Sequence, residues 1–193
     1  MLGYVALYLN LQLVRGSFMS VRKQEIPIVS PLSKVHFRKP RLEDGPAVWS
    51  LVRDTQVLDL NSSYCYLMLS SYFQETCVVA EKGDQVVGFV SGFIPENQPK
   101  TLFIWQVAVS QKARGLGIGT SMLKRLLSRP ICRNVRYLET TVSPSNAPSE
   151  AMFRRIARDL ATELKVAGEI SAGLFPGHDH EPERVFRIGP FDR

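Results

Sequence analysis

A glycine-rich turn between an apolar run and an amphipathic stretch constrains this chain most strongly. The run Thr101–Ser110 (TLFIWQVAVS) is apolar on both alternating faces, as expected for a strand buried in the middle of a sheet. The turn Arg114–Thr120 (RGLGIGT) contains three glycines, which let a main chain approach a ligand closely. A helix that starts there would direct its free N–H groups and its positive dipole end at one point, beside Arg114. The segment therefore predicts a strand, a tight loop and a helix that together cradle a pyrophosphate.

Two other glycine-rich phosphate-binding patterns do not fit this turn. The pattern G-x-x-x-x-G-K-[ST] is absent, and the spacing Gly115-x-Gly117-x-Gly119 differs from the G-x-G-x-x-G of dinucleotide-binding folds. A tight turn with glycine caps and no ligand is the remaining alternative. The preceding strand, Arg114 and a stretch from Asn97 to Leu138 with eight basic and no acidic residues favour the binding interpretation.

The order of the other patterns indicates an α/β protein with one mixed sheet. Strands are predicted where β-branched and aromatic residues cluster, and helices where apolar residues recur at three- and four-residue spacing. The predicted strands are Lys34–Arg41, Cys77–Glu81, Gln85–Ile94, Thr101–Ser110, Val135–Val142 and Arg184–Ile188, and the predicted helices are Asp44–Leu58, Cys65–Phe73, Gly115–Arg129 and Ser145–Leu164. Asp44 is expected to cap the first helix, and Asn61 or Ser62 the second. Lys82-Gly83-Asp84 is expected to form a hairpin turn.

Length and composition fit a single globular domain. The chain has 193 residues, of which 45% are hydrophobic and 22% charged, and no apolar run reaches the roughly 20 residues of a membrane-spanning helix. The three cysteines include no C-x-x-C pair, which argues against a disulfide framework and a structural zinc site. We therefore expect a cytoplasmic protein that does not associate with membranes.

The basic character of the chain comes from its leading segment. Of 24 Lys and Arg and 18 Asp and Glu residues, seven basic residues and one acid lie in residues 1–41, which leaves 17 of each in the remainder. A neutral body argues against nucleic-acid binding, which requires clustered positive charge. Residues 1–33 start with a mostly apolar run that lacks the features of a signal peptide. We interpret them as an appendage to a domain that spans residues 34–191.

The glycine-rich turn resembles the acyl-CoA-binding signature of the Gcn5-related N-acetyltransferase (GNAT) family, which is R-x-x-G-x-G after V-A-V and before an amphipathic helix. The resemblance covers about Lys34–Phe191 and implies a mixed sheet flanked by helices, with acetyl-CoA as cosubstrate and no metal. The strand at Val107–Val109 is then expected to bind the pantetheine arm and to donate an N–H to the tetrahedral oxyanion. The implied cofactor-binding residues are Val107, Ala108, Val109, Arg114, Gly115, Leu116, Gly117, Ile118, Gly119 and Thr120, with Asn146 as a second element at the start of a helix.

Four segments carry a closer resemblance to one branch of that family. They are DLNSSYCYLMLSSYF, FIWQVAVSQKARGLGIG, LETTVSPSNAPSEAMF, and GHDHEPE followed by VFRIGP. Enzymes of that branch acetylate the 4-amino group of L-2,4-diaminobutyrate, a small diamino acid, in ectoine biosynthesis. The resemblance implies this activity and a homodimer. An acetyltransferase for another small amine, such as a polyamine or an amino sugar, and a CoA-binding regulatory module without catalysis remain alternatives at this point.

The acceptor site is expected to be acidic, because such a substrate carries two ammonium groups and one carboxylate. Its predicted residues are Asp59, Tyr64, Trp105, Thr141, His178 and Glu181, with Glu183 as a further candidate in the same segment as Glu181. Trp105 is equally compatible with core packing. Since the attacking amine must first lose a proton, Glu181 and His178 are the predicted base or proton relay.

Two further features of the sequence bear on this chemistry. His178-Asp179-His180 has a metal-binding composition, but acyl transfer to an amine requires no metal. Phe153 stands where many family members have a tyrosine that protonates the leaving thiolate, so that role has no phenol here.

Overall fold

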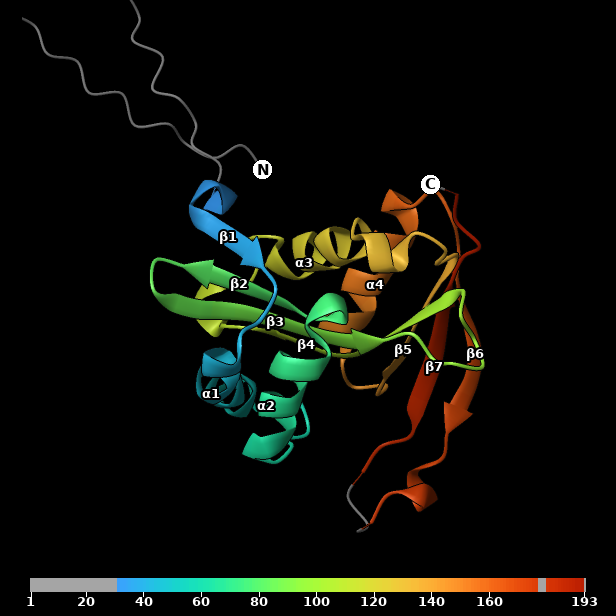
Figure 1. The fold of residues 1–193 in the computed structure, drawn as a ribbon. Coiled ribbons are helices and arrows are strands. Elements are labelled where there is room, and N and C mark those ends of the chain that lie inside the picture. The colour runs from blue at the N-terminus through green and yellow to red at the C-terminus, as the bar shows by residue number, and fades with distance from the viewer. Residues whose placement is uncertain (1–30, 177–179, 193) are drawn as a thin grey trace, which may run out of the picture.

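The computed structural model describes residues 31–176 and 180–192, and its centre is a mixed sheet. The strand order is β1-β2-β3-β4-β5-β7-β6 (Figure 1). The strands are β1 (Val35–Arg38), β2 (Val78–Lys82), β3 (Gln85–Phe93), β4 (Thr101–Val109), β5 (Tyr137–Val142), β6 (Leu164–Ile170) and β7 (Glu183–Ile188). Within the described residues, β4 and β5 are the one parallel pair, and the other neighbours are antiparallel. The predicted α/β class is confirmed.

The helices cover the two faces of the sheet in pairs (Figure 1). On one face, α1 (Gly45–Thr55) and α2 (Ser63–Tyr72) bury Val48, Val52 and Tyr66 against Phe89 and Ala108 of the sheet. On the other face, α3 (Ile118–Leu127) and α4 (Ala147–Asp159) contribute to the larger core, which includes Met122, Leu126, Ile156, Leu102 and Ile104. The helices α1, α3 and α4 each turn an apolar stripe to the sheet, as their three- and four-residue spacing predicts. None of the helices in the described part of the chain is long and apolar enough to cross a bilayer.

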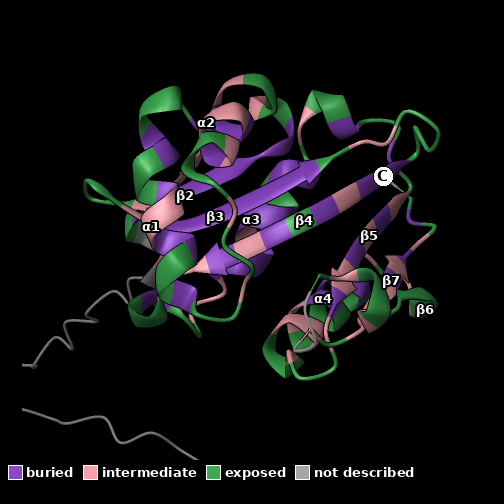
Figure 2. Ribbon diagram, turned by 90° about the horizontal axis from the view of Figure 1, so that it is seen from below, coloured by how far each residue is buried: buried purple, intermediate pink, exposed green. Residues whose placement is uncertain are grey.

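The strands β4 and β5 separate part-way along their length. Their pairing runs from Thr101↔Tyr137 to Ile104↔Thr140 and stops there, although β4 continues to Val109 and β5 to Val142. At the same level, the pairing of β3 with β4 contains a bulge. Ser91 pairs with Gln106 and the next residue, Gly92, pairs with Ile104, so Trp105 is an extra residue on β4. A bulge of this kind bends the strand and increases its twist. The divergence opens the sheet in the middle of the molecule (Figure 2).

Several predicted helix boundaries differ from the structure. The first helix ends at Thr55 rather than Leu58, and the second begins at Ser63 rather than Cys65. The third helix begins at Ile118 rather than Gly115, because Gly115 and Gly117 both have a φ of +77°, which a right-handed helix does not accept. The fourth ends at Asp159 rather than Leu164, and Leu164 instead starts β6, a strand that the sequence did not predict. Six of the seven β6 residues are exposed, so the strand carries no alternating apolar pattern, and β6 appears largely green in Figure 2.

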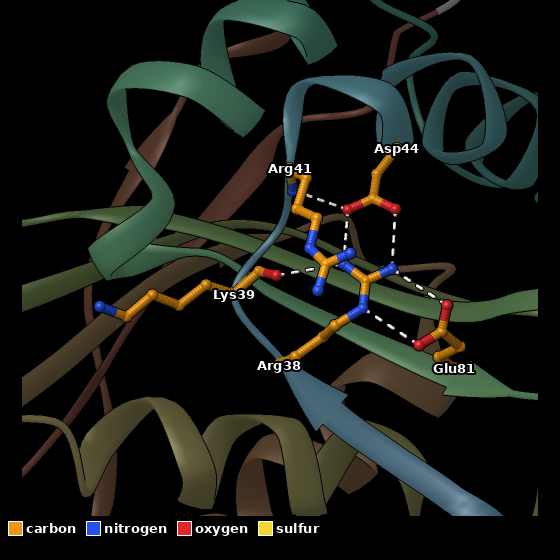
Figure 3. A network of polar contacts seen from close by, with 5 residues as sticks. All are labelled: Arg38, Lys39, Arg41, Asp44 and Glu81. Carbon is orange, nitrogen blue, oxygen red and sulfur yellow. Dashed lines mark hydrogen bonds and ion pairs between the residues drawn. The ribbon is translucent and has the colours of Figure 1, made fainter.

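A network of charges joins β1 to the start of α1 (Figure 3). The Arg38 guanidinium donates to both carboxylate oxygens of Asp44, at 2.6 and 2.8 Å, and to both of Glu81, at 3.1 Å each. The Arg41 N–H also donates to Asp44, at 2.6 Å. Asp44 occupies the predicted cap position of α1, but its side chain makes no capping hydrogen bond, because these partners on β1 and in the connection after it occupy the carboxylate. Ser62 caps α2 as predicted, by accepting from the Cys65 N–H.

Residues 1–30 lie outside the described residues, so the interpretation of the leading segment as an appendage stays a prediction. Pro31–Lys34 form a short 3-10 helix. Within it, Leu32 is partly buried and packs against the larger core.

Candidate active site

The glycine-rich turn forms a hollow in front of the first turn of α3. Gly117 is the N-cap residue of α3, and no described side chain caps the helix there. The N–H groups of the first helical turn have no partner within the helix, so they can receive an anion. A Cβ placed on Gly115 or Gly117 would meet no atom within 4 Å, which shows that the space in front of both residues is open. The turn therefore fits the pyrophosphate cradle predicted from the sequence.

A cavity of about 810 Å³ extends from this cradle to the start of α4. Arg114 is exposed at its edge, where its Nε lies 3.4 Å from the Val109 carbonyl and donates to it. Asn146 is the N-cap of α4 and accepts from the Ser149 N–H at 3.2 Å. The predicted cofactor-binding residues that line the cavity are Val107, Val109, Arg114, Gly115, Gly117, Ile118, Gly119, Thr120 and Asn146.

Two predicted cofactor-binding residues do not line this cavity. The side chain of Ala108 is fully buried against α1 and α2 on the opposite face of the sheet, so only its main chain is available to a ligand at the strand edge. Leu116 is partly buried and packs against the larger core instead. Phe153 is 2% exposed and is also part of that core.

A second cavity, of about 620 Å³, lies over the divergence of β4 and β5 and receives the segment that follows α1. It contains three carboxylates, those of Asp59, Glu181 and Glu183, together with the His180 ring. Its aromatic lining comes from Phe93, Phe103, Trp105 and Phe175, and Trp105 remains 43% exposed. Four residues line both cavities, namely Val57, Ser143, Ser145 and Asn146. The two cavities therefore meet beside the divergence of the strands.

Glu181 is held at the wall of the second cavity by Ser145. Its Oε2 accepts from the Ser145 N–H at 3.0 Å. Hydrogen bonds from the side chain and the main chain of Ser145 lower the pKa of Glu181 below its ordinary value. Glu181 is consequently a stable anion, which suits ammonium binding better than proton uptake.

His180 bridges two segments that border the second cavity. Its Nδ1 lies 2.6 Å from the Glu181 carbonyl and its Nε2 lies 3.3 Å from Asp59 Oδ2. Both partners only accept hydrogen bonds, so the geometry requires a proton on each ring nitrogen. The hydrogen bond to the Glu181 carbonyl, followed by the Asp59 carboxylate, raises the pKa of His180. Its ring also stacks on Phe175, with centroids 3.7 Å apart.

Glu183 differs from the other two carboxylates of the cavity. It is the first residue of β7, and its pKa is raised above the ordinary value by burial, which outweighs a hydrogen bond from Thr141. Asp59 and Glu181 add negative charge that raises it further. The pKa of Glu183 is therefore shifted in the opposite direction to that of Glu181.

Comparisons with known proteins agree with this geometry. The family model of the acetyltransferase (GNAT) family matches residues 46–157. The chain belongs to the GNAT family. An L-2,4-diaminobutyric acid acetyltransferase from Shouchella clausii is 46% identical over 168 residues, which are 87% of this chain and 93% of the relative. One from Halalkalibacterium halodurans is 49% identical over 152 residues, or 79% and 80% of the two chains.

Solved structures of related proteins have the same fold as this chain. The diaminobutyrate acetyltransferase EctA from Paenibacillus lautus, in complex with L-2,4-diaminobutyric acid and coenzyme A, superposes with a TM-score of 0.80 at 46% identity. The superposition covers 82% of this chain and 96% of that chain. Ard1 from Thermoplasma volcanium, with a TM-score of 0.67 at 15% identity, shares the GNAT fold.

The structure of this GNAT protein brings together most of the predicted acceptor residues. Asp59, Trp105, Thr141 and Glu181 all line the second cavity. Tyr64 is 67% exposed on α2 and lines neither cavity. His178 lies outside the described residues, so its predicted role stays a prediction. In the described part of the chain, no three or more His, Cys, Asp and Glu side chains are arranged to hold a metal ion.

Sequence reasoning missed several residues of this acetyltransferase site. His180 was considered only as part of a metal-binding composition, and Glu183 was considered as an acceptor contact but not as a base. Both belong to the GHDHEPE segment that carries the resemblance. Phe175 and Gln106 also line the cavity, and no local pattern marks either residue.

Proposed function

We propose that the protein transfers the acetyl group of acetyl-CoA to the 4-amino group of L-2,4-diaminobutyrate, a step of ectoine biosynthesis. The observation that carries this proposal is the meeting of the two cavities beside the divergence of β4 and β5. One cavity has a pyrophosphate cradle, and the other has three carboxylates for a dicationic acceptor. The names and ligands of relatives at 46–49% identity support the same substrate pair.

The residues around the first cavity would hold the cosubstrate. Acetyl-CoA supplies an activated acetyl group as its thioester. The N–H groups at the start of α3 and Arg114 bind the pyrophosphate, and the main chain of β4 beyond Ile104 is free of β5 and offers its polar groups to the pantetheine arm. An N–H of the Val107–Val109 edge stabilises the oxyanion that forms during acyl transfer.

The residues around the second cavity would anchor the acceptor. The 2-ammonium and 4-ammonium groups differ in their distance from the substrate carboxylate, so a site that fixes the amino-acid end leaves the 4-amino group for the thioester. Asp59 and Glu181 anchor that end through charge-assisted contacts of their carboxylates, and the lowered pKa of Glu181 favours its anionic form.

Glu183 is the group that accepts the proton of the 4-ammonium. Glu181 and His178 were the residues expected for this role, but the Ser145 contacts favour the anionic form of Glu181. Burial gives Glu183 a higher proton affinity than Glu181. The difference between the pKa of Glu183 and that of the substrate ammonium, ordinarily near 10, is therefore smaller. The neutral amine then attacks the thioester carbonyl, and the C–S bond breaks. The nitrogen gives its remaining extra proton to water as the amide forms. The thiolate takes a proton from water, since Phe153 is an apolar core residue.

The protein acts in the cytoplasm as a homodimer, without nucleic-acid or membrane partners. The strand β6 supports self-association. It is the last strand of the sheet, so its outer edge is unpaired within the described residues, and most of its residues are exposed. Exposed sheet edges are commonly covered by another chain. Sedimentation at micromolar concentration tests the dimer.

The function is tested by following thiol release from acetyl-CoA. We expect release with L-2,4-diaminobutyrate and almost none without an acceptor. A panel that includes putrescine, spermidine and glucosamine tests the acceptor class, and a higher kcat/KM for any of these amines would contradict the proposal. Absence of thiol release with every amine, in a protein that still binds CoA, would indicate a regulatory module instead.

A further inference from the structure

A buried hydrogen-bond network connects β4 and α2 to the segment that carries Asp59. The Tyr66 hydroxyl donates to Gln106 Oε1 at 3.2 Å, and Gln106 Nε2 donates to the Asp59 carbonyl at 2.8 Å. The Asn61 N–H donates to the Tyr66 hydroxyl at 3.3 Å. Tyr66 is fully buried and Gln106 is 5% exposed, so water competes little for these bonds.

The network fixes both ends of a three-residue segment. It holds the Asp59 carbonyl at one end and the Asn61 N–H at the other, while Leu60 between them is 44% exposed. The Asp59 side chain is not part of the network. It is 84% exposed and, within the described residues, its one polar partner is the His180 ring across the cavity. The main chain of Asp59 is therefore immobilised, and its carboxylate is left available to the acceptor cavity.

Gln106 also lies beside the point where β4 and β5 diverge. It lines the acceptor cavity and sits directly after Trp105, the extra residue of the bulge at which β4 leaves β5. Val107, the next residue, lines the cosubstrate cavity. The amide of Gln106 thus joins the strand expected to carry the thioester to the segment expected to bind the acceptor ammonium.

We propose that Tyr66 and Gln106 are positioning residues that set the distance between the Asp59 carboxylate and the thioester, and thereby select the chain length of the diamino acid. This inference rests on the proposed function, because it assumes that Asp59 binds an acceptor ammonium. A fixed spacing accepts a substrate whose two nitrogens are separated by the matching number of methylenes and misplaces shorter or longer homologues. A misplacement of about 1 Å is enough to cost a large part of the rate.

The test uses Tyr66→Phe, which removes one hydroxyl and keeps the ring that packs against Phe89. The acceptors are L-2,4-diaminobutyrate, L-2,3-diaminopropionate and L-ornithine. We expect the kcat/KM preference of the wild-type protein for diaminobutyrate over both homologues to fall at least ten-fold in Tyr66→Phe. Gln106→Leu should do the same. Tyr72→Phe on the same helix, where the ring is 76% exposed, should keep the wild-type preference.

Two further measurements separate positioning from general stability. In an Asp59→Asn background, Tyr66→Phe should change kcat/KM less than two-fold, because the carboxylate that it positions is gone. Amide hydrogen exchange of Asn61 should accelerate in Tyr66→Phe while exchange in α3 stays unchanged. An equal loss for all three acceptors, or additive effects of the two substitutions, would overturn the proposal. If the wild-type protein acetylates none of the acceptors, the proposed function fails, and the exchange of Asn61 still reports whether the network fixes the segment.

Discussion

Asp59 and His180 are 121 residues apart in the chain, and their side chains form an ion pair of 3.3 Å across the acceptor cavity. The pair joins the segment after α1 to the segment before β7, and both segments border the cavity outside regular elements. The raised pKa of His180 favours a charged ring, and this ring faces the carboxylate that we expect to meet the substrate ammonium. The protonation of the His180 ring therefore reports on the Asp59 carboxylate in the acceptor cavity.

The first prediction concerns the proton of His180. Its pKa in the folded protein is raised, so this ion pair stabilises the folded state fully below the unfolded pKa and loses its effect as the pH rises through the folded pKa. An NMR titration of the imidazole C–H signals should give a pKa above the ordinary value of about 6.5. Asp59→Asn should lower that pKa. An unchanged pKa in Asp59→Asn would show that the pair does not persist in solution.

The second prediction concerns the cradle before α3. Gly117→Val forces a β-branched side chain into a left-handed conformation and places it in the open space in front of the helix, so CoA affinity should fall at least about ten-fold. Arg114→Ala, which removes a charge without changing the main chain, is the matched variant and should also weaken CoA binding. Isothermal calorimetry with CoA measures both. Wild-type affinity in a folded Gly117→Val protein would remove the pyrophosphate from this turn.

The third prediction separates the roles of Glu183 and Glu181. If Glu183 accepts the proton, Glu183→Gln should lower kcat by about 100-fold or more. Because the raised pKa of Glu183 must be exceeded for the carboxylate to act, wild-type activity should fall as the pH falls through a value above the ordinary Glu pKa. The variant should lose this dependence. Activity is measured from pH 5 to about 10.

Glu181→Gln is the matched control for that experiment. It removes an anion that binds an ammonium, a contact of about 1.5–3 kcal/mol, so KM for diaminobutyrate should rise about 10- to 100-fold with most of kcat retained. The assignment is wrong if the two variants exchange these behaviours.

The fourth prediction concerns the charge network of β1. Arg38→Ala leaves the Asp44 carboxylate, whose side chain is 10% exposed, without its bidentate partner, and should reduce the free energy of unfolding by about 3 kcal/mol. Lys39→Ala removes a cation from the exposed pair with Glu75 and should cost less than about 1 kcal/mol. Urea unfolding monitored by circular dichroism gives both values.

The stability difference between the wild-type protein and Arg38→Ala should depend on pH through the carboxylates of Asp44 and Glu81. Burial raises the pKa of Asp44, but the hydrogen bonds from Arg38 and from the Arg41 N–H outweigh this effect, so the pKa of Asp44 is lowered. A hydrogen bond from Arg38 also lowers the pKa of Glu81. The stabilisation is therefore present above the ordinary carboxyl pKa of about 4 and is lost as the pH falls through the lowered values. A difference between wild type and Arg38→Ala that persists at pH 2 would argue against the ion pairs as its cause.

Local patterns in the sequence were sufficient for the parts of the site that local structure determines. The cradle could be predicted because glycine is the residue that tolerates a φ of +77°, and the helix after it has a clear apolar spacing. The strand β4 could be predicted because it is apolar on both faces. Each of these features is encoded within about ten neighbouring residues.

Other features depend on partners that are distant in the sequence. The strand β6 is held by β7, and its exposed residues resemble those of a loop. The contacts of Gln106 with Asp59, and of Asp59 with His180, span 47 and 121 residues. Glu181 and Glu183 are two residues apart, yet a hydrogen bond lowers the pKa of one and burial raises that of the other. The composition of the loop therefore indicated acidity but not which carboxylate takes a proton.

The regiochemistry of the product shows directly which amino group the protein acetylates. Purified protein is incubated with acetyl-CoA and L-2,4-diaminobutyrate, and the product is assigned by two-dimensional NMR through the coupling of the acetyl amide proton to the neighbouring carbon protons. We predict acetylation of the 4-amino group, with the amide proton coupled to a methylene. Acetylation of the 2-amino group, with the amide proton coupled to the α-carbon proton, would contradict it.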